Sequence, residues 1–268
     1  MRLPTLLVLA TLSLCGCDMV QVYQGQIDRA TRTIEEAKTD GARASAYAER
    51  GRAYSNKARL SLVRHQIDRA EYLRLFDLAI ADHDAADKLA PSDAEVAFQR
   101  GLTDYDRAAM VEDLVEIDHQ PWFDAARSAF ESTVRLHPGH AVAYDYLGLV
   151  EEQTGRFDEA ISAYTHVMAF DRKLGRSRLG DLYCNRGQAY LRDKSYDLAA
   201  TELEKSTELV GAADGCSCEP FNSLAAIYVV ETAQYDKGWD LVRRARDTGH
   251  FIAPEYIDRL TQATGRKG

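Results

Sequence analysis

The sequence predicts an all-α protein built from repeated helical hairpins. A Tyr-x-x-Arg-Gly-x-x-Tyr phrase occurs at residues 47–54 and 183–190, and parts of it return at Arg100-Gly101 and at Tyr144-x-x-Leu147-Gly148. Helix-favouring Ala, Leu, Arg, Glu and Asp dominate, and no run of alternating β-branched residues indicates a sheet. A repeat of this kind predicts a solenoid with an extended binding surface, which makes an enclosed catalytic pocket less expected.

The length, composition and net charge of the chain indicate its domain organisation and its class of binding partner. The 268 residues are 46% hydrophobic and 28% charged, which fits one large domain or an elongated array and does not fit a disordered chain. The formal net charge is -9. Because an acidic surface disfavours nonspecific binding to nucleic acid and anionic lipid headgroups, we expect protein partners and no nucleic acid.

Residues 1–16 are expected to be an export signal. Arg2 gives a positive start, and residues 3–14 form an apolar stretch too short to span a bilayer as a mature helix. Leu14-Cys15-Gly16-Cys17 then resembles a bacterial lipobox, because only Cys17 follows a small residue. The resemblance implies diacylglycerol on Cys17. The alternative is an ordinary cleaved signal with an incidental cysteine.

Lipidation would anchor the protein without a transmembrane helix, since each buried CH₂ contributes ~0.8 kcal/mol. The expected location is the bacterial cell envelope, with the chain facing the periplasm. Asp18 resembles the inner-membrane retention signal of enterobacterial lipoproteins, a rule that does not hold across all bacteria, so inner versus outer membrane stays open.

Residues 17–42 should contain the lipidated N-terminus and a capping helix that ends at Asp40-Gly41. Six side chains follow a spacing that places them on one helical face: Val20, Tyr23, Ile27, Ala30, Ile34 and Ala37. The stretch is shorter than a typical coiled coil. We therefore expect it to cover the open end of the first repeat, with a dimer seam as the alternative.

The clearest repeat, residues 141–174, resembles the tetratricopeptide repeat (TPR), a helix-turn-helix unit of ~34 residues. Tyr144, Gly148, Ala160 and Tyr164 match its positions 4, 8, 20 and 24, whereas Arg172 departs from it. Small residues at positions 8 and 20 allow a close helix crossing, and large residues fill the gaps. The resemblance implies a right-handed superhelix of about five repeats in an array over 43–251. The expected repeats are 44–91, 94–138, 141–174, 180–213 and 218–251.

Three places depart from the regular repeat. The first and second copies are about 16 and 13 residues too long between their two halves. Residues 56–77 contain neither Gly nor Pro, which indicates lengthened helices or an ordered loop. These extensions are expected either to form a partner-specific surface or to pack on each other. The fifth copy shows an apparent one-residue insertion before Gly238. A C-terminal capping helix and tail should occupy 252–268, starting at Pro254.

No motif indicates an enzyme, a metal or a cofactor. His83 stands between two aspartates, but it occupies repeat position 24, so we interpret it as a buried filler and not as a ligand. His137 and His140 lie in a turn without the Cys or carboxylate partners of a tetrahedral site. Gly-rich phosphate loops, His-Glu-x-x-His and Gly-x-Ser-x-Gly are absent from the sequence.

Three cysteines remain after the leader and Cys17. In the repeat register Cys184 lies near the start of one A helix, and Cys216 and Cys218 lie at the start of the next. We therefore expect Cys184 to pair with Cys216 or Cys218 outside the cytoplasm, a staple worth ~3 to 4 kcal/mol by chain entropy. A Cu(I) or Zn²⁺ thiolate site, a redox-active thiol, and free thiols are the alternatives.

The resemblance also implies a peptide-binding groove lined by A-helix positions 2, 5, 9, 12 and 13. This chain lacks the Lys/Asn carboxylate clamp of chaperone-binding members, and the mixed lining suits a peptide helix or extended segment. The candidate groove residues are Arg52, Asn56, Phe98, Leu102, Tyr105, Asp145, Leu149, Glu152, Gln153, Gln188 and Arg192.

The sequence therefore predicts a membrane-anchored scaffold that recruits envelope proteins or peptides through the concave groove or through extended repeats 1 and 2. It looks like the TPR lipoproteins that act as adaptors for cell-wall hydrolases or as pilotins for pilus and secretin assembly. The alternative function is a periplasmic metal- or thiol-redox-binding protein that uses Cys184, Cys216 and Cys218.

Overall fold

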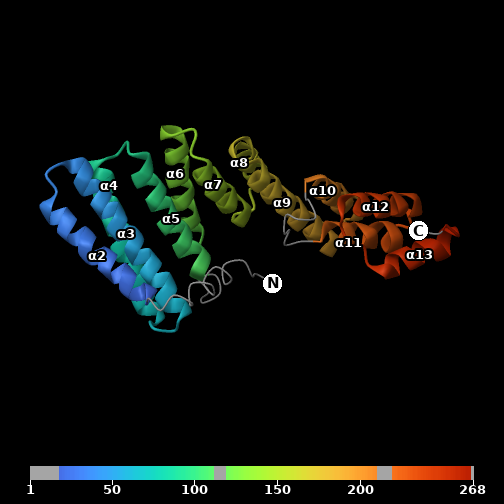
Figure 1. Cartoon of the computed structure of the whole chain (residues 1–268), viewed down its shortest axis with the longest axis horizontal. Coiled ribbons are helices and arrows are strands. Elements are labelled where there is room, and N and C mark those ends of the chain that lie inside the picture. Colours follow the sequence, from blue (N-terminus) through green and yellow to red (C-terminus); the bar gives the residue numbers. More distant parts are fainter. Residues whose placement is uncertain (1–17, 112–118, 210–218, 267–268) are drawn as a thin grey trace. The chain divides into compact units, whose positions relative to one another are not determined.

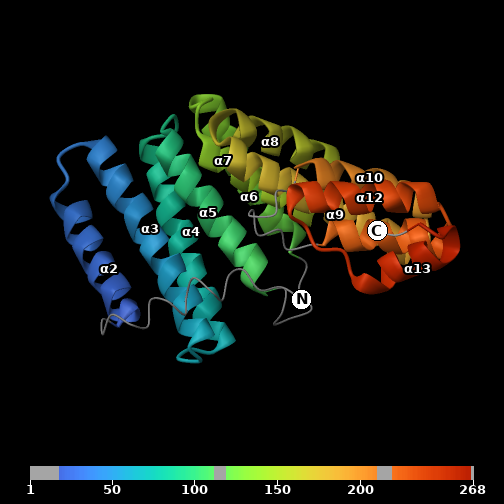
Figure 2. The same ribbon diagram turned by 45° about the vertical axis from the view of Figure 1, so that its right-hand side comes forward.

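The chain is helical wherever the structure describes it. The computed structural model describes residues 18–111, 119–209 and 219–266, and no strand occurs in these ranges. The expected leader, Cys17, Cys216 and Cys218 lie outside them. Figures 1 and 2 show helices that follow one another as antiparallel neighbours. The predicted all-α fold of helical hairpins is confirmed. Within the described ranges no helix has the length and apolar character needed to cross a membrane.

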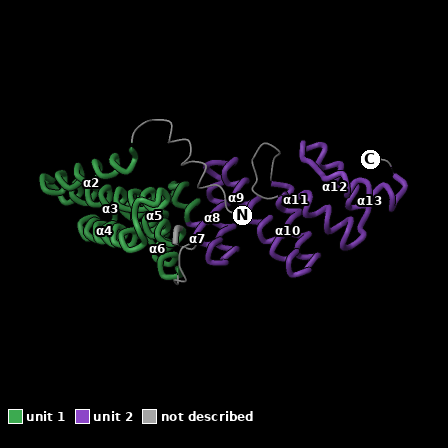
Figure 3. The backbone as a smooth tube through the Cα atoms, turned by 90° about the horizontal axis from the view of Figure 1, so that it is seen from below, with its two compact units in different colours: residues 1–146 green, residues 147–268 purple. Residues whose placement is uncertain are grey.

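The chain divides into two compact units, residues 1–146 and 147–268, coloured separately in Figure 3. The boundary falls within α7 (Ala141–Gln153). Unit 1 also contains α2 (Met19–Glu36), α3 (Asp40–Val63), α4 (Arg69–Leu89), α5 (Ala94–Val111) and α6 (Gln120–Leu136). Unit 2 also contains α8 (Phe157–Phe170), α9 (Arg172–Arg192), α10 (Tyr196–Leu209), α11 (Pro220–Ala225), η2 (Ala226–Glu231), α12 (Tyr235–Thr248) and α13 (Pro254–Thr264).

The first helices of unit 1 begin at side chains that cap them. The oxygens of Asp18, Thr39 and Asp68 accept backbone N–H groups at the starts of α2, α3 and α4. The expected break at Asp40-Gly41 is wrong, because Thr39 caps α3 directly before these two residues and they form its first turn. Helix α2 packs on α3 and buries Ile27 and Ala30.

A glycine contact fixes the crossing of four of the hairpins. A Cβ added to Gly148 would lie 2.3 Å from the Tyr164 ring, so only glycine lets these helices approach so closely. The same contact recurs in the other hairpins with different partners: Gly51 meets His83, Gly101 meets Phe130 and Gly187 meets Leu203. These are repeat positions 8 and 24, as the packing pattern predicts.

Four hairpin turns within the described residues share one backbone conformation. His65, Lys194 and Ala233 have φ values of 55°, 58° and 52°, and Gly155 has 74°. The next N–H then bonds to a carbonyl five residues back, from Gln66 to Ser61 at 2.8 Å in the first hairpin and from Ser195 to Tyr190 at 2.9 Å in the fourth. This left-handed ending satisfies carbonyls that the A helix leaves free.

The extension of the first repeat consists of lengthened helices. Helices α3 and α4 have 24 and 21 residues and are separated only by the turn at 64–68. Beyond the Gly51 crossing they pack through Ala58, Tyr72, Leu75 and Phe76, which are buried in one apolar cluster. Much of the extension is therefore used in packing the two helices together.

Two further departures have local causes. The extra residue of the fifth repeat is absorbed by the π-helical turn η2, where the Thr232 N–H reaches back to the Ile227 carbonyl at 2.9 Å. Helix α9 begins at Arg172, well before the expected repeat start at 180, because Asp171 caps it. Its first turn crosses α8 so closely that a Cβ on Gly175 would lie 2.4 Å from the Cα of Met168.

The core of unit 2 surrounds α12. Leu203, Phe221, Leu224, Trp239 and Leu260 are buried in one cluster. Helix α13 starts at Pro254, as expected, and is held to α12 by a hydrogen bond of 3.1 Å from Trp239 Nε1 to Thr264 Oγ1. This arrangement covers the apolar side of the last hairpin.

Candidate binding surface

Arg52, the first predicted groove residue, belongs to a charged cluster in unit 1. Its Nη1 lies 2.6 Å from Asp106 Oδ2, and Arg59 Nη1 lies 3.0 Å from the same oxygen. The Asp106 side chain is 9% exposed, whereas those of Arg52 and Arg59 are 21% and 26% exposed. Two guanidinium groups on α3 are thus joined to α5 through one carboxylate.

The cluster changes the titration of its neighbours. Burial opposes the charge on Arg59, but the negative charge and hydrogen bond of Asp106 outweigh it and raise the pKa of Arg59. Burial and the nearby Asp106 charge raise the pKa of Tyr146. Arg59 therefore stays protonated and Tyr146 stays neutral across the physiological pH range.

The other groove residues of unit 1 offer little free surface. Phe98 and Leu102 are 9% and 8% exposed. The Phe98 ring lies 6.0 Å from Phe130, and Tyr105 lies 5.4 Å from Tyr146, centroid to centroid. Asp145 is buried and has interactions of its own, and Asn56 is half-buried. The groove positions of this unit are mainly used for packing.

Unit 2 leaves more of its groove positions open. Gln153, Gln188 and Arg192 are exposed on α7 and α9, and Leu149 is half-buried. Glu152 accepts hydrogen bonds of 3.1 Å from Asn185 Nδ2 and from Tyr164 Oη. Burial raises the pKa of Glu152, and these hydrogen bonds partly oppose that effect. Unit 2 therefore presents polar side chains at the register positions associated with peptide binding.

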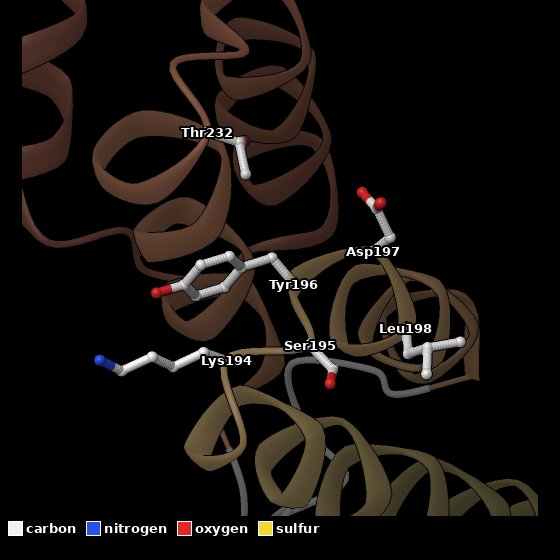
Figure 4. Close-up of a pocket in the computed structure, with 6 residues that line it drawn as sticks. All are labelled: Lys194, Ser195, Tyr196, Asp197, Leu198 and Thr232. Carbon is white, nitrogen blue, oxygen red and sulfur yellow. The ribbon is translucent and has the colours of Figure 1, made fainter.

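A shallow depression of about 410 Å³ lies in unit 2 beside the α9–α10 turn (Figure 4). Its lining consists of residues 194–198 and Thr232. Tyr196 Oη donates a 2.8 Å hydrogen bond to Glu231 Oε2 at the end of η2. Lys194 and Asp197 supply opposite charges, and Leu198 is exposed, so the depression has no single ligand preference. None of its residues was among the predicted site residues.

His83 is a core residue, as its repeat position indicated. It is fully buried, and its Nε2 lies 2.9 Å from Thr103 Oγ1. Burial, with smaller effects from Arg100 and Arg52, lowers the pKa of His83 to about 3. The imidazole is therefore neutral at pH 7 and fills the gap against Gly51.

Cys184 is fully buried and disulfide-bonded. Its two expected partners, Cys216 and Cys218, lie outside the described ranges, so the choice between them stays a prediction. Among the residues that the structure does describe, no three His, Cys, Asp or Glu side chains are grouped closely enough to hold a metal ion.

Sequence reasoning missed two members of the charged cluster. Asp106 occupies position 13 of the second repeat, the same position as Asn56, so the register could have identified it. Arg59 lies beyond the repeat pattern, in the extension of α3. Its partner across the helices could not be inferred from spacing within one repeat.

Comparisons with known proteins agree with this architecture. Residues 139–212 match a family model described as tetratricopeptide repeat. The nuclear import adaptor Nro1 of S. pombe is 15% identical, with 91% of this chain and 92% of Nro1 covered and a TM-score of 0.58. This likeness concerns the fold alone.

Two further solved structures are also similar, at lower TM-scores. MamA of Desulfovibrio magneticus is 15% identical, covering 81% of this chain and 97% of MamA, with a TM-score of 0.40. YrrB, described as a TPR protein with an unusual peptide-binding site, is 18% identical, covering 88% of this chain and 92% of its own, with a TM-score of 0.43. The family match over residues 139–212 and the likeness to Nro1 together indicate that the chain has the fold of a tetratricopeptide-repeat protein.

Proposed function

We propose that this protein is a lipid-anchored scaffold that recruits other envelope proteins on the periplasmic side of a bacterial membrane. The proposal rests on one observation: some repeat positions are used for helix packing and others stay exposed to solvent. Recurring glycines and rings are used in helix crossings, whereas Gln153, Gln188 and Arg192 remain exposed at A-helix positions of unit 2. Such a surface serves recognition of a peptide or protein better than it serves catalysis.

The polar character of this surface suggests the class of ligand. Gln153 can both donate and accept hydrogen bonds, and Arg192 adds a positive charge. A peptide segment offers backbone carbonyl and N–H groups to the Gln153 amide and a carboxylate side chain to Arg192. We therefore expect an extended or helical peptide segment with at least one acidic residue.

Capture from membranes tests the scaffold. The intact protein, crosslinked gently in cells and purified from membranes, should retain specific envelope proteins. The double variant Gln153→Ala/Arg192→Glu should lower their recovery at least about tenfold, since an exposed binding surface loses both a hydrogen-bonding group and its cation. The matched control is Arg246→Glu, a charge reversal of an exposed residue on α12. Equal recovery with both variants would contradict the proposed surface.

The anchor is tested separately. Cells grown with an alkyne fatty acid should label the wild-type protein, and Cys17→Ser should abolish both labelling and sedimentation with membranes. Cys15→Ser is the matched control, because Cys15 is expected to leave with the leader. Membrane association that survives Cys17→Ser would argue against the anchor while leaving the capture result unaffected.

The cysteine-based alternative requires its own measurement. Replacing Cys184, Cys216 and Cys218 with Ser should leave partner capture unchanged if these residues only stabilise the fold. Because Cys184 is disulfide-bonded, it does not supply a thiolate for a metal ion, and three free thiols in the oxidised, denatured protein would contradict this bond.

A further inference from the structure

We propose that unit 1 binds a carboxylate between α3, α4 and α5, through Arg59 Nε, Tyr72 Oη and Arg107 Nε. Arg59 and Tyr72 belong to the lengthened part of the first hairpin, and Arg107 belongs to the helix that follows it. The site is separate from the exposed surface of unit 2 on which the proposed function rests, and it gives the extension a binding role.

Three packed helices each bring one residue to this site. Arg59 is on α3, Tyr72 on α4 and Arg107 on α5, and each of these helices packs against the other two. Figures 1 and 2 show the three helices as neighbours. Trp122 packs against the apolar cluster that contains Tyr72, and the Arg107 guanidinium carbon lies 4.5 Å from the centre of the Trp122 ring. Tyr72 and Arg107 are therefore gathered around the same indole.

The site contains three buried polar atoms that form no hydrogen bond within the described part of the protein. They are Arg59 Nε, Tyr72 Oη and Arg107 Nε, and Tyr72 as a whole is only 1% exposed. Native proteins rarely bury a donor without a partner, because the donor gives up its hydrogen bonds to water and gains nothing in return. Three such donors in one place therefore indicate a bound group.

The Tyr72 hydroxyl lies close to the charged cluster. Burial, followed by the negative charge of Asp106, raises the pKa of Tyr72, and the positive charges of Arg59 and Arg107 partly oppose this increase. Because such interactions weaken with distance, the hydroxyl lies near all three charged groups. The phenol stays protonated and can donate its hydrogen to an anion.

The ion pairs around the site leave one positive charge without a counter-charge. Arg52 Nη1 and Arg59 Nη1 share a single oxygen of Asp106, at 2.6 and 3.0 Å, and Arg107 Nη1 pairs with Asp77 at 3.0 Å. Three cations thus face two carboxylates. The Asp77 side chain is 67% exposed, so water screens its charge and the excess positive charge is stronger than the formal count.

The chemistry of the site selects a carboxylate. Two guanidinium N–H groups and one hydroxyl can donate to a ligand with two acceptor oxygens. One negative charge balances the excess, whereas a divalent phosphate would add a second negative charge beside Asp106. Asp104, one helical turn before Arg107, does not compensate the excess, because it is paired with Arg100 Nε at 2.7 Å. The ligand is therefore a small free acid or an Asp or Glu side chain of a peptide.

Titration of the full chain with isotope-labelled acetate, followed by NMR of the carboxylate carbon, tests the site. The variant Arg59→Met/Arg107→Met keeps long side chains but lacks both N–H donors, so acetate affinity should fall at least about tenfold. Arg29→Met/Arg32→Met removes two exposed cations from α2 and is the matched control. Equal acetate affinity in the wild type and both variants would overturn the proposal. Circular dichroism checks that each variant folds.

A smaller change tests the site without removing a charge. Tyr72→Phe keeps the ring and loses only the hydroxyl, which is unpaired within the described residues. Without acetate it should leave the unfolding temperature unchanged or raise it, and acetate affinity should fall at least about threefold. A lower unfolding temperature without acetate, together with unchanged acetate affinity, would show that an ordered water alone completes the hydroxyl, and the proposal would fail.

Other ligands define the class. Competition of acetate with the capped tripeptide Ac-Gly-Glu-Gly-NH2 would identify a peptide side chain as a ligand, whereas binding of acetate alone would assign a small free acid. Chloride and phosphate at equal ionic strength should bind more weakly, and equal binding of chloride would mean an adventitious ion only. These measurements do not involve Gln153 or Arg192, so this site and the proposed partner surface can fail independently.

Discussion

The hairpins α3/α4 and α9/α10 both contain more residues than the repeat pattern requires. The added residues lie next to the turn in the first hairpin and at the start of α9 in the second. Gly51 and His83 cross in the first, and Gly187 and Leu203 cross in the second. The first pair is twice as far apart in sequence, because both helices continue beyond the crossing toward their turn. In the second hairpin the turn is short and α9 instead extends backward to Arg172.

The place of growth decides what the added residues do. Additional residues next to the turn lengthen two helices together and create new surface, including Arg59 and the turn at 64–68. Growth at the open end lengthens one helix only, which then packs on the preceding helix where Gly175 meets Met168. One addition can carry a binding function, whereas the other strengthens the stack.

The largest effect on the free energy of unfolding is expected at the start of α9, where this helix crosses α8. Gly175→Ala should destabilise the protein by about 3 kcal/mol, because the new Cβ would meet backbone atoms of Met168 that cannot rotate away. Gly25→Ala is the control: nothing lies within 4 Å of its added Cβ, and a helical Ala should stabilise α2 by about 0.5–1 kcal/mol. Urea unfolding followed by circular dichroism measures both. A cost below about 1 kcal/mol at Gly175 would mean that the α8–α9 crossing is looser than described.

The next effect compares two carboxylates that each serve two cations. Asp106→Asn should cost about 2 kcal/mol, since Arg52 and Arg59 would lose their shared counter-charge near the protein interior. Glu202→Gln in the α9/α10 hairpin should cost about 1 kcal/mol, because it removes the counter-charge of Arg186, which is 18% exposed, whereas its second partner Lys205 is 46% exposed and keeps its hydration. The same unfolding assay applies. A larger loss for Glu202 would reverse the ranking of the two clusters.

The crossings should also differ in their response to acid. The pKa of His83 is about 3 in the folded protein and ~6.5 when unfolded, so below pH 6.5 the unfolded chain binds an extra proton. Stability from this group is complete above pH 6.5 and falls by up to about 1.4 kcal/mol per pH unit toward pH 3. His83→Leu, which copies the Leu203 crossing, should remove that slope between pH 6.5 and 5. The exposed control His65→Gln should keep it, and equal slopes in both variants would disprove the assignment.

The smallest effect concerns the turns, where the two hairpins should behave alike. His65→Gly and Lys194→Gly should each stabilise by about 0.5–1 kcal/mol, because glycine adopts positive φ without the side-chain penalty. Thermal unfolding at neutral pH measures the gain. A loss at either position would show that its side chain has contacts worth more than the backbone strain.

The sequence predicted the helix crossings well because each crossing requires particular residue types, and few substitutions would fit there. A glycine and a large side chain at matching repeat positions identify a helix contact, even when the intervening segment is lengthened, as between Gly51 and His83. The extra length itself was ambiguous, since residues rich in Ala, Arg and Leu suit helices in either direction. Arg172 departs from the repeat pattern, and in the structure it begins α9 after the cap at Asp171.

The binding surface was less predictable than the fold. The repeat register predicts which positions line the groove. It does not predict whether the side chain at such a position is exposed or is used in contacts within the protein. Phe98 and Leu102 are packed away in unit 1, and Arg52 is held by Asp106. Asp18 also shows this limit, because a residue considered as a sorting signal caps α2 and contacts Arg64. Pairings between repeats decide these outcomes, and they require three-dimensional coordinates.

The π-helical turn η2 shows how such an array tolerates changes in chain length. The extra residue bulges within η2, and Gly238 nevertheless packs against Val229 and Leu260. Each hairpin has its own helix crossing. An inserted residue therefore changes the repeat positions of the residues that follow it only as far as the next crossing. Insertions and deletions can therefore accumulate in one hairpin without disturbing its neighbours. The array can acquire new surfaces while the distance between successive hairpins stays the same.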